Sequence, residues 1–264
     1  MPAFTGYFDA AGSESDSDVI VACGALSFTD DWDRFDQEWS AVMRTEGVPS
    51  VHMKDFAAFK PPFDVGWRDN EPRRREFLGS LIRLTNETVF RLYVTTLVLS
   101  DYKRVNAKFQ MSEHLANPYA WVMANCLFHT FDWLLGEDEP PPGDPRRPVS
   151  PEDVVGLFVE KGDAGQGGLR KLMKVLGWTD REYDETIQVI PKRLGEEDIT
   201  PFNVPDFVAY EYRSEHRYFV ENRQKRPVPR RALQAVRAEL YPRVGIVTAE
   251  MMRQACIDND VPRR

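Results

Sequence analysis

The chain has 264 residues, of which 42% are hydrophobic and 12% aromatic, so it is long enough to bury a substantial core. Its formal net charge of -8 argues against a protein that coats nucleic acid by bulk electrostatics, although a local basic surface is compatible with it. The sequence contains no apolar run of about 18 residues and no signal-peptide pattern, which predicts a cytoplasmic protein that does not span a membrane.

The first half of the chain predicts three strands and two helices. Residues 3–9 and 18–28 are apolar runs joined by a short polar loop, which is typical of a hairpin. Apolar residues at helical spacing predict a helix over 30–47 and a second one over 71–86. The run at 89–100 is rich in β-branched and aromatic residues and predicts a third strand.

The second half alternates between helices and strands. A nearly continuous apolar helix begins at Pro118, and the Pro-rich segment 137–153 after it predicts an exposed loop. Residues 154–160 are apolar without interruption, as in a strand that is covered on both faces. The remaining expected elements are a helix at 169–177, a strand near 186–190 and a helix at about 204–219.

Three leading strands followed by alternating helices and strands form the RNase H-like order, here with a helical insertion between the second and third strands. This order predicts an α/β domain over residues 1–219 with a mixed sheet flanked by helices, and a basic helical C-terminal extension over 220–264. A right-handed crossover through the Pro118 helix would place the strand at 154–160 parallel to the first strand and beside it.

Two acids, Asp9 and Glu160, each end an apolar strand in the same way. If these strands are parallel neighbours, both acids lie at the sheet edge where open α/β sheets bind ligands. Carboxylates this close repel each other unless a cation lies between them. Mg²⁺ and Mn²⁺ prefer oxygen ligands and support phosphodiester cleavage, so the pattern predicts a divalent-metal site.

Three further residues are candidates for this site, and each has a structural alternative. Asp206 can point from its helix to the same edge, or it can form a capping arrangement with Asn203. Asp163 lies in a Gly-rich loop and is either a metal ligand or a turn residue. His52, three residues before Asp55, can act as a substrate contact, proton shuttle or peripheral ligand, or can form an ordinary hydrogen-bonded pair.

The segment 217–243 is the one candidate basic surface for nucleic acid, and a solvated helical tail is the alternative. It contains eight cations against two acids: Arg217, Arg223, Lys225, Arg226, Arg230, Arg231, Arg237 and Arg243 against Glu221 and Glu239. Three widely spaced cysteines in apolar or helical surroundings predict buried free thiols: Cys23, Cys126 and Cys256.

Four short stretches match motifs of a known family: DAAG at 9–12, HMKDF at 52–56, LFVEKGD at 157–163 and NVPDFVA at 203–209. On these the chain resembles the bacterial domain of unknown function 3800 family, whose members are assigned an RNase H-like fold. The resemblance implies that fold and favours a site role for Asp206 over capping. The family's second-position Glu, however, is Ala10 in this chain.

The sequence therefore predicts a nuclease or phosphodiesterase that depends on Mg²⁺ or Mn²⁺. The predicted catalytic residues are Asp9, Glu160, Asp206 and His52, and the predicted metal ligands are Asp9, Glu160, Asp206 and Asp163. The alternative is a binding or assembly protein that keeps the fold without enzymatic activity, which Ala10 and the acidic net charge support.

Overall fold

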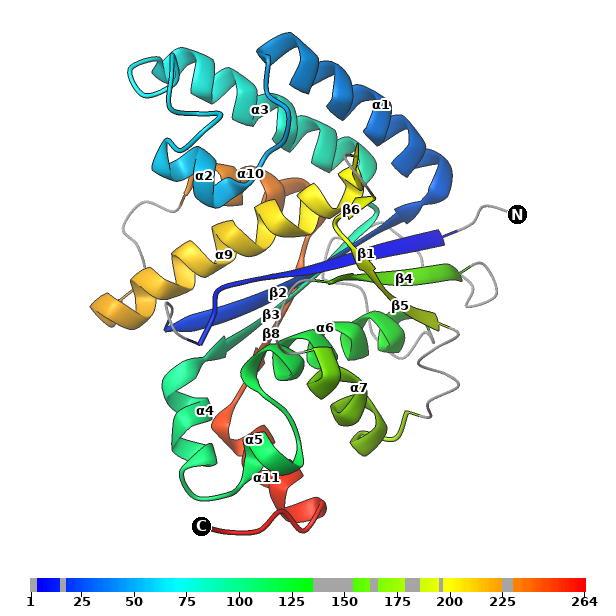
Figure 1. Ribbon diagram of the computed structural model, residues 1–264, viewed down its shortest axis with the longest axis vertical. Coiled ribbons are helices and arrows are strands. Elements are labelled where there is room, and N and C mark those ends of the chain that lie inside the picture. Colours follow the sequence, from blue (N-terminus) through cyan, green and yellow to red (C-terminus); the bar gives the residue numbers. More distant parts are fainter. Residues whose placement is uncertain are drawn as a thin grey trace.

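The computed structural model has an α/β architecture, with a mixed six-stranded sheet and helices on both of its faces (Figure 1). This agrees with the α/β class and the mixed sheet flanked by helices that the sequence predicts. The expected loop at 137–153 lies outside the described residues. The structure describes residues 4–14, 18–134, 154–161, 166–178, 186–194, 197–224 and 230–264.

The strand order in the sheet is β5-β4-β1-β2-β3-β8. Strands β1, β2 and β3 are antiparallel to their neighbours in this series, whereas β4 is parallel to β1, β5 to β4 and β8 to β3. The predicted hairpin and the predicted parallel pairing of the first and fourth strands are both confirmed. The strands are β1 (Phe4–Ala11), β2 (Val19–Phe28), β3 (Arg91–Val98), β4 (Val154–Lys161), β5 (Ile187–Pro191) and β8 (Arg243–Val247), and a separate pair consists of β6 (Arg193–Leu194) and β7 (Glu197–Asp198).

The helices form two layers, one on each face of the sheet (Figure 1). The upper layer in that view contains α1 (Thr29–Glu46), α2 (Met53–Ala58), α3 (Glu71–Thr88), α9 (Asn203–Asn222), which follows the 3-10 turn η2 (Thr200–Phe202), and α10 (Arg231–Leu240). The lower layer contains α4 (Leu99–Asn106), α5 (Met111–His114), α6 (Pro118–Leu134), α7 (Gln166–Val175) and α11 (Ala249–Asp258). Within the described residues, no helix is long and apolar enough to cross a membrane.

A separate hydrophobic core fills the space on each side of the sheet. Strand β1 supplies both, because successive side chains of a strand point to opposite faces. Phe4 and Phe8 are fully buried in the core beneath α6, whereas Tyr7 packs against the core beneath α9 and stacks on Phe158 of β4. By the same alternation Asp9, two residues after Tyr7, points to the α9 face.

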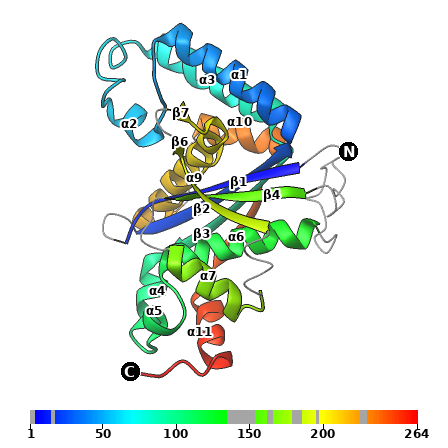
Figure 2. The same cartoon turned by 45° about the vertical axis from the view of Figure 1, so that its right-hand side comes forward.

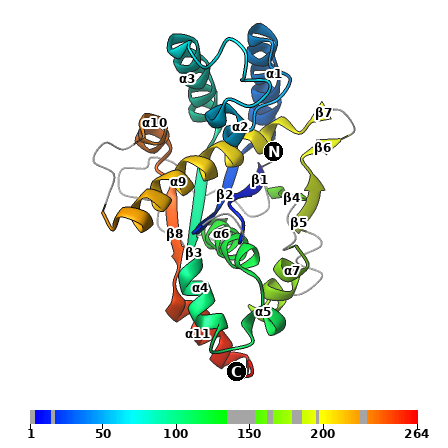
Figure 3. The same ribbon diagram turned by 60° about the vertical axis from the view of Figure 1, so that its left-hand side comes forward.

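The C-terminal segment differs from the helical extension that the sequence predicts. Residues 243–247 form strand β8, which pairs with β3 at the edge of the sheet opposite β5 (Figure 3). The run is short and lies close after an arginine-rich helix, but its Val and Ile residues favour a strand once the edge of β3 is available. The three cysteines are buried free thiols, as predicted.

Replacing Gly24 by Ala is expected to lower the free energy of unfolding by about 1–3 kcal/mol through overpacking. Gly24 lies opposite Phe8 in the β1–β2 register, and an added Cβ would overlap the Phe8 ring. The matched control is Gly79→Ala on the exposed side of α3, where no atom lies within 4 Å of the added Cβ. That change is expected to raise stability by up to about 1 kcal/mol. Urea unfolding measures the free energy of unfolding of both variants and of the wild type. A Gly24→Ala variant as stable as the wild type would contradict the tight packing at Gly24.

Candidate functional site

Two acids occupy matching positions on neighbouring parallel strands. Phe8 of β1 is in register with Val159 of β4, so Asp9 and Glu160 are the next residues on each strand. Both lie near the carboxyl ends of their strands, which run side by side in Figure 2. Their side chains are close enough to share a hydrogen bond. The main-chain N–H of Ala10 also donates to Asp9 Oδ1, at 2.6 Å.

The third acid, Asp206, reaches the same place from the first turn of α9, which packs across β1 and β2. Asp206 does not form the capping arrangement with Asn203 that was its alternative. Asn203 is itself the first residue of the helix, and its side-chain amide donates to the carbonyl of Thr200. The structure therefore brings together one acid from each of β1, β4 and α9.

A lysine that the sequence reasoning missed lies among these acids. Lys192 directly follows β5, and its Nζ is 3.2 Å from Asp206 Oδ2 and 3.7 Å from Asp9 Oδ2. The lysine side chain is only 12% exposed. We call Asp9, Glu160, Asp206 and Lys192 the carboxylate cluster. A signal for Lys192 existed in the sequence, because it ends the apolar run TIQVIP much as Asp9 and Glu160 end theirs.

His52 stands at the rim of the carboxylate cluster. Its Nδ1 is 3.6 Å from Asp206 Oδ2, which is an electrostatic contact and too long for a good hydrogen bond. The imidazole is 45% exposed, so it is in contact with both the cluster and the solvent. Asp163, the remaining predicted ligand, lies outside the described residues.

The electrostatics of the cluster push the pKa values of its two aspartates apart. Burial raises the pKa of Asp9 well above its ordinary value, and the hydrogen bond with Glu160 and the nearby Asp206 add to this effect. Burial alone would also raise the pKa of Asp206, but His52 and Lys192 outweigh it and the pKa is lowered. Such a separation between neighbouring carboxyl groups is typical of functional sites.

Lys192 is held in its charged form by the same groups. Burial alone would lower its pKa, but the carboxylates of Asp206, Asp9 and Glu160 outweigh burial and raise it. Three carboxyl groups therefore face a single permanent cation. A proton on Asp9 also relieves the excess of negative charge, which adds to the effect of burial in raising the pKa of Asp9.

The donor chemistry of the cluster fits a hard divalent cation. Carboxylate oxygens are the ligands that Mg²⁺ and Mn²⁺ prefer, and the excess negative charge would be neutralised by such an ion. Asp9, Glu160 and Asp206 are the residues that would hold it. Among the described residues, however, no three His, Cys, Asp or Glu side chains already surround a common point as metal ligands do. Two of the carboxylates contact the Lys192 ammonium instead.

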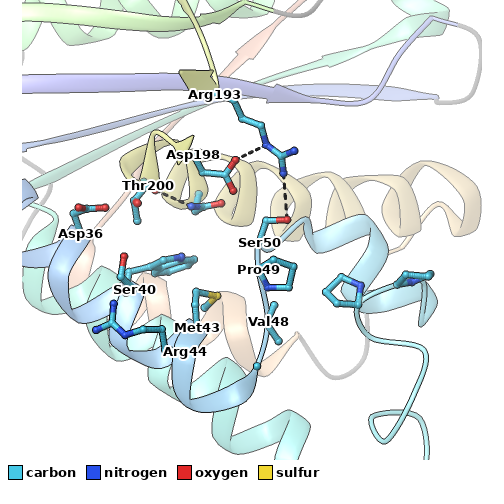
Figure 4. Close-up of a pocket in the computed structure, with 15 residues that line it drawn as sticks. Asp36, Ser40, Met43, Arg44, Val48, Pro49, Ser50, Arg193, Asp198 and Thr200 are labelled. Atoms are coloured by element: carbon cyan, nitrogen blue, oxygen red, sulfur yellow. Dashed lines mark hydrogen bonds and ion pairs between the residues drawn. The ribbon is translucent and has the colours of Figure 1, made fainter. Parts of the chain in front are cut away.

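A groove of about 1110 Å³ is lined in part by close chain neighbours of the cluster residues (Figure 4). Its walls come from α1, the segment 47–50, and the β6–β7 pair with the start of α9. Arg193 extends into it from β6, pairs with Asp198 and donates to Ser50 Oγ at 3.3 Å. Arg193 and Ser50 are within two residues of Lys192 and His52, so the same chain segments build the groove and the cluster.

The basic segment 217–243 uses several of its cations within the protein. Arg230 makes a bidentate pair with the buried Glu211, and Arg237 donates to the Tyr212 hydroxyl. Arg217 pairs with Glu221 one helical turn away. Lys225 and Arg226 lie outside the described residues. Part of the expected basic surface is therefore committed to internal contacts.

No protein-family model matches the chain, and no curated protein matches it either. The function of the protein is accordingly inferred from the chemistry of the carboxylate cluster and its surroundings.

Proposed function

We propose that this protein is a divalent-metal-dependent phosphodiesterase with an RNase H-like fold that cleaves nucleic acid. The observation that carries the proposal is that acids from three separate elements meet near the carboxyl ends of β1 and β4: Asp9 and Asp206 both contact the Lys192 ammonium group, and Asp9 also contacts Glu160. Such a cluster costs folding free energy, because like charges are held close together in a desolvated place. Lys192 offsets only part of that cost, because its one ammonium group faces three carboxyl groups, and a divalent cation would offset the rest.

The strand arrangement supports the fold part of the proposal. Three antiparallel strands, β1 to β3, are extended on the β1 side by the parallel strands β4 and β5, as we expect of an RNase H-like sheet, and β8 adds a sixth strand beside β3. The short motifs shared with the domain of unknown function 3800 family point the same way. Three of those motifs contain Asp9, His52 and Glu160, and the fourth contains Asp206, so all four contribute to one site.

In the proposed reaction, Asp9, Glu160 and Asp206 hold the metal, which when bound activates water and stabilises negative charge on the leaving oxygen. The fold brings these three carboxyl groups together from β1, β4 and α9, so the negative charge that would attract a metal is already at one place. His52 lies beside Asp206 and is open to solvent, which places it to move a proton between bulk water and the reacting oxygens.

The groove near the cluster, of about 1110 Å³, has room for part of a substrate strand. Its hydroxyl and guanidinium groups are donors of the kind that bind phosphate oxygens. Asp36 and Asp198 also line it, so we expect hydrogen bonding and shape to position the strand more than bulk charge. The donor groups are Ser40, Arg44, Ser50, Arg193 and Thr200.

A cleavage assay tests the proposal directly. Purified protein is incubated with labelled RNA, DNA and RNA–DNA hybrid in Mg²⁺ or Mn²⁺, with EDTA as the control. We expect cleavage of at least one substrate that EDTA abolishes. Intact substrates throughout, at metal concentrations that saturate the protein, would contradict the assignment.

A second candidate, a binding protein that keeps the fold without catalysis, is favoured by two observations. Ala10 stands where the family that the chain resembles carries Glu, and the Lys192 ammonium group contacts two of the carboxylates without any metal. Calorimetry separates the two functions, because a binding protein of this kind need not bind Mn²⁺ at millimolar concentration. An oligonucleotide bound without cleavage, and without metal, would support it.

A further inference from the structure

Lys192 occupies the centre of the site in an unusual way. Its ammonium group is close to Asp9 and Asp206 at once, at 3.7 Å and 3.2 Å, and its side chain is nearly buried. The two carboxylates come from β1 and α9, so the lysine joins a strand to the helix that covers it. The same carboxylate oxygens are the ones that would hold a metal ion.

An ammonium group and a divalent ion compete for such a position. Both are attracted by the same carboxylate oxygens, and each would repel the other at a distance of a few ångströms with little water between them. The compact charge of Lys on a flexible four-carbon stem can leave without moving the backbone. The lysine is therefore a cation that the protein can withdraw when another cation arrives.

The neighbouring residue shows that the backbone at this place is held. Arg193 points into the adjacent groove, where Asp198 and Ser50 bind its guanidinium group (Figure 4). The side chains of these two adjacent residues therefore extend into different places, Lys192 into the carboxylate cluster and Arg193 into the groove. Withdrawal of Lys192 can then occur by rotation of its side chain, because the main chain is held: the Ile199 N–H donates to the Lys192 carbonyl at 2.8 Å, and Arg193 pairs with Asp198 in the β6–β7 ladder.

We propose that Lys192 is an internal counter-ion that stabilises the metal-free protein and must be displaced before a divalent ion binds. The inference rests on the proposed metal-dependent function and adds a form of regulation to it. The metal-free protein is kept folded and inactive by its own lysine, and metal loading is weakened by the free energy needed to remove that lysine from Asp9 and Asp206.

Calorimetry with Mn²⁺ on the full chain tests this, with Lys192→Met as the variant and Lys192→Arg as the matched control. Met keeps the length and the apolar stem of the side chain but has no charge, whereas Arg keeps the charge. We expect Lys192→Met to bind Mn²⁺ tighter by on the order of 10-fold or more, because a competing charge is gone. Lys192→Arg is expected to bind weakly, like the wild type.

Thermal unfolding with and without Mn²⁺ gives a second readout that does not depend on activity. Without metal, Lys192→Met is expected to melt below the wild type, and Mn²⁺ is expected to raise its melting temperature more than that of the wild type. If Lys192→Met does not fold without metal, the double variant Lys192→Met/Asp206→Asn serves instead, because it has one carboxylate fewer. Recovery of folding in that double variant would support the counter-ion role, and failure to recover would count against it.

The outcomes separate this inference from the proposed function. Equal or weaker Mn²⁺ binding by Lys192→Met, or no binding by either protein, would overturn the counter-ion role. Tighter binding by Lys192→Met together with no cleavage of any nucleic acid would support the counter-ion role and contradict the phosphodiesterase. If the wild type cleaves nucleic acid but Lys192→Met does not change the affinity for Mn²⁺, the phosphodiesterase is supported and the counter-ion role is contradicted.

Discussion

Replacing Asp9 by Asn is expected to reduce metal-dependent cleavage by roughly 1000-fold or more, because a metal ligand and several kcal/mol of charge stabilisation are lost. Asn keeps the shape of Asp and can still accept the hydrogen bond from the Ala10 N–H. The loss would therefore come from the missing charge and not from a change of packing. The measurement is single-turnover cleavage at saturating Mn²⁺.

The same substitution is expected to raise stability at neutral pH when EDTA keeps metal away. The pKa of Asp9 is raised in the folded protein, first by burial and then by Glu160, so the folded state prefers the neutral carboxyl group. Such a group contributes stability that is fully present below its ordinary pKa and is lost as the pH rises through the folded value. Asn is neutral at every pH, so the advantage of Asp9→Asn should grow with pH above about 4.

Asp101→Asn is the matched control, since Asp101 makes an exposed pair with Arg104 on α4, on the other face of the sheet. Its cleavage rate should equal that of the wild type. Full activity in Asp9→Asn would remove Asp9 from the site. A loss of stability that accompanies the loss of activity would show that Asp9 has a structural role instead.

Replacing Arg230 by Ala is expected to cost about 3 kcal/mol of unfolding free energy, because it leaves the Glu211 carboxylate buried without its partner. Arg230 donates two hydrogen bonds to Glu211, of 2.6 Å and 2.7 Å, and Glu211 is only 1% exposed. The pair joins α9 to the start of α10. We place the cost at the low end of the range for buried pairs, because the Arg230 side chain is 33% exposed and water can reach it.

The control for this prediction is Arg217→Ala, which removes an exposed pair with Glu221 on the same helix. That change is expected to cost less than about 1 kcal/mol. Adding Glu211→Gln to Arg230→Ala should recover most of the loss, because the unpaired charge is then absent. Urea unfolding of the four proteins decides the matter, and a double variant as unstable as Arg230→Ala would show that packing, not charge, holds α9 and α10 together.

Local sequence patterns were sufficient to predict most strands of the sheet and two members of the carboxylate cluster. Each of β1 and β4 is an apolar run that ends in an acid, and the Gly- and Pro-rich segments between the elements mark their ends. The order of the elements along the chain also predicted that β1 and β4 pair in parallel, because crossover connections have a fixed hand. Asp9 and Glu160 could therefore be placed at one sheet edge from the sequence alone.

Local sequence patterns could not predict that β8 joins the sheet or that Lys192 lies among the acids of the site. The run RVGIV is five residues long and forms a strand because the edge of β3 is free to pair with it, which is a property of the assembled sheet. Lys192 follows β5, and its local sequence does not show that Asp206, on a helix more than ten residues later, lies above it.

The sequence by itself determined that the apolar runs of β1 and β4 end in Asp9 and Glu160, because apolar runs are local properties of the chain. Only the tertiary structure decided how those residues meet. The distance between Lys192 and its two carboxylates depends on strand register and on the packing of α9 across the sheet, and both depend on contacts between distant parts of the chain. The charge balance of the site, three acids around one lysine, follows from that packing alone.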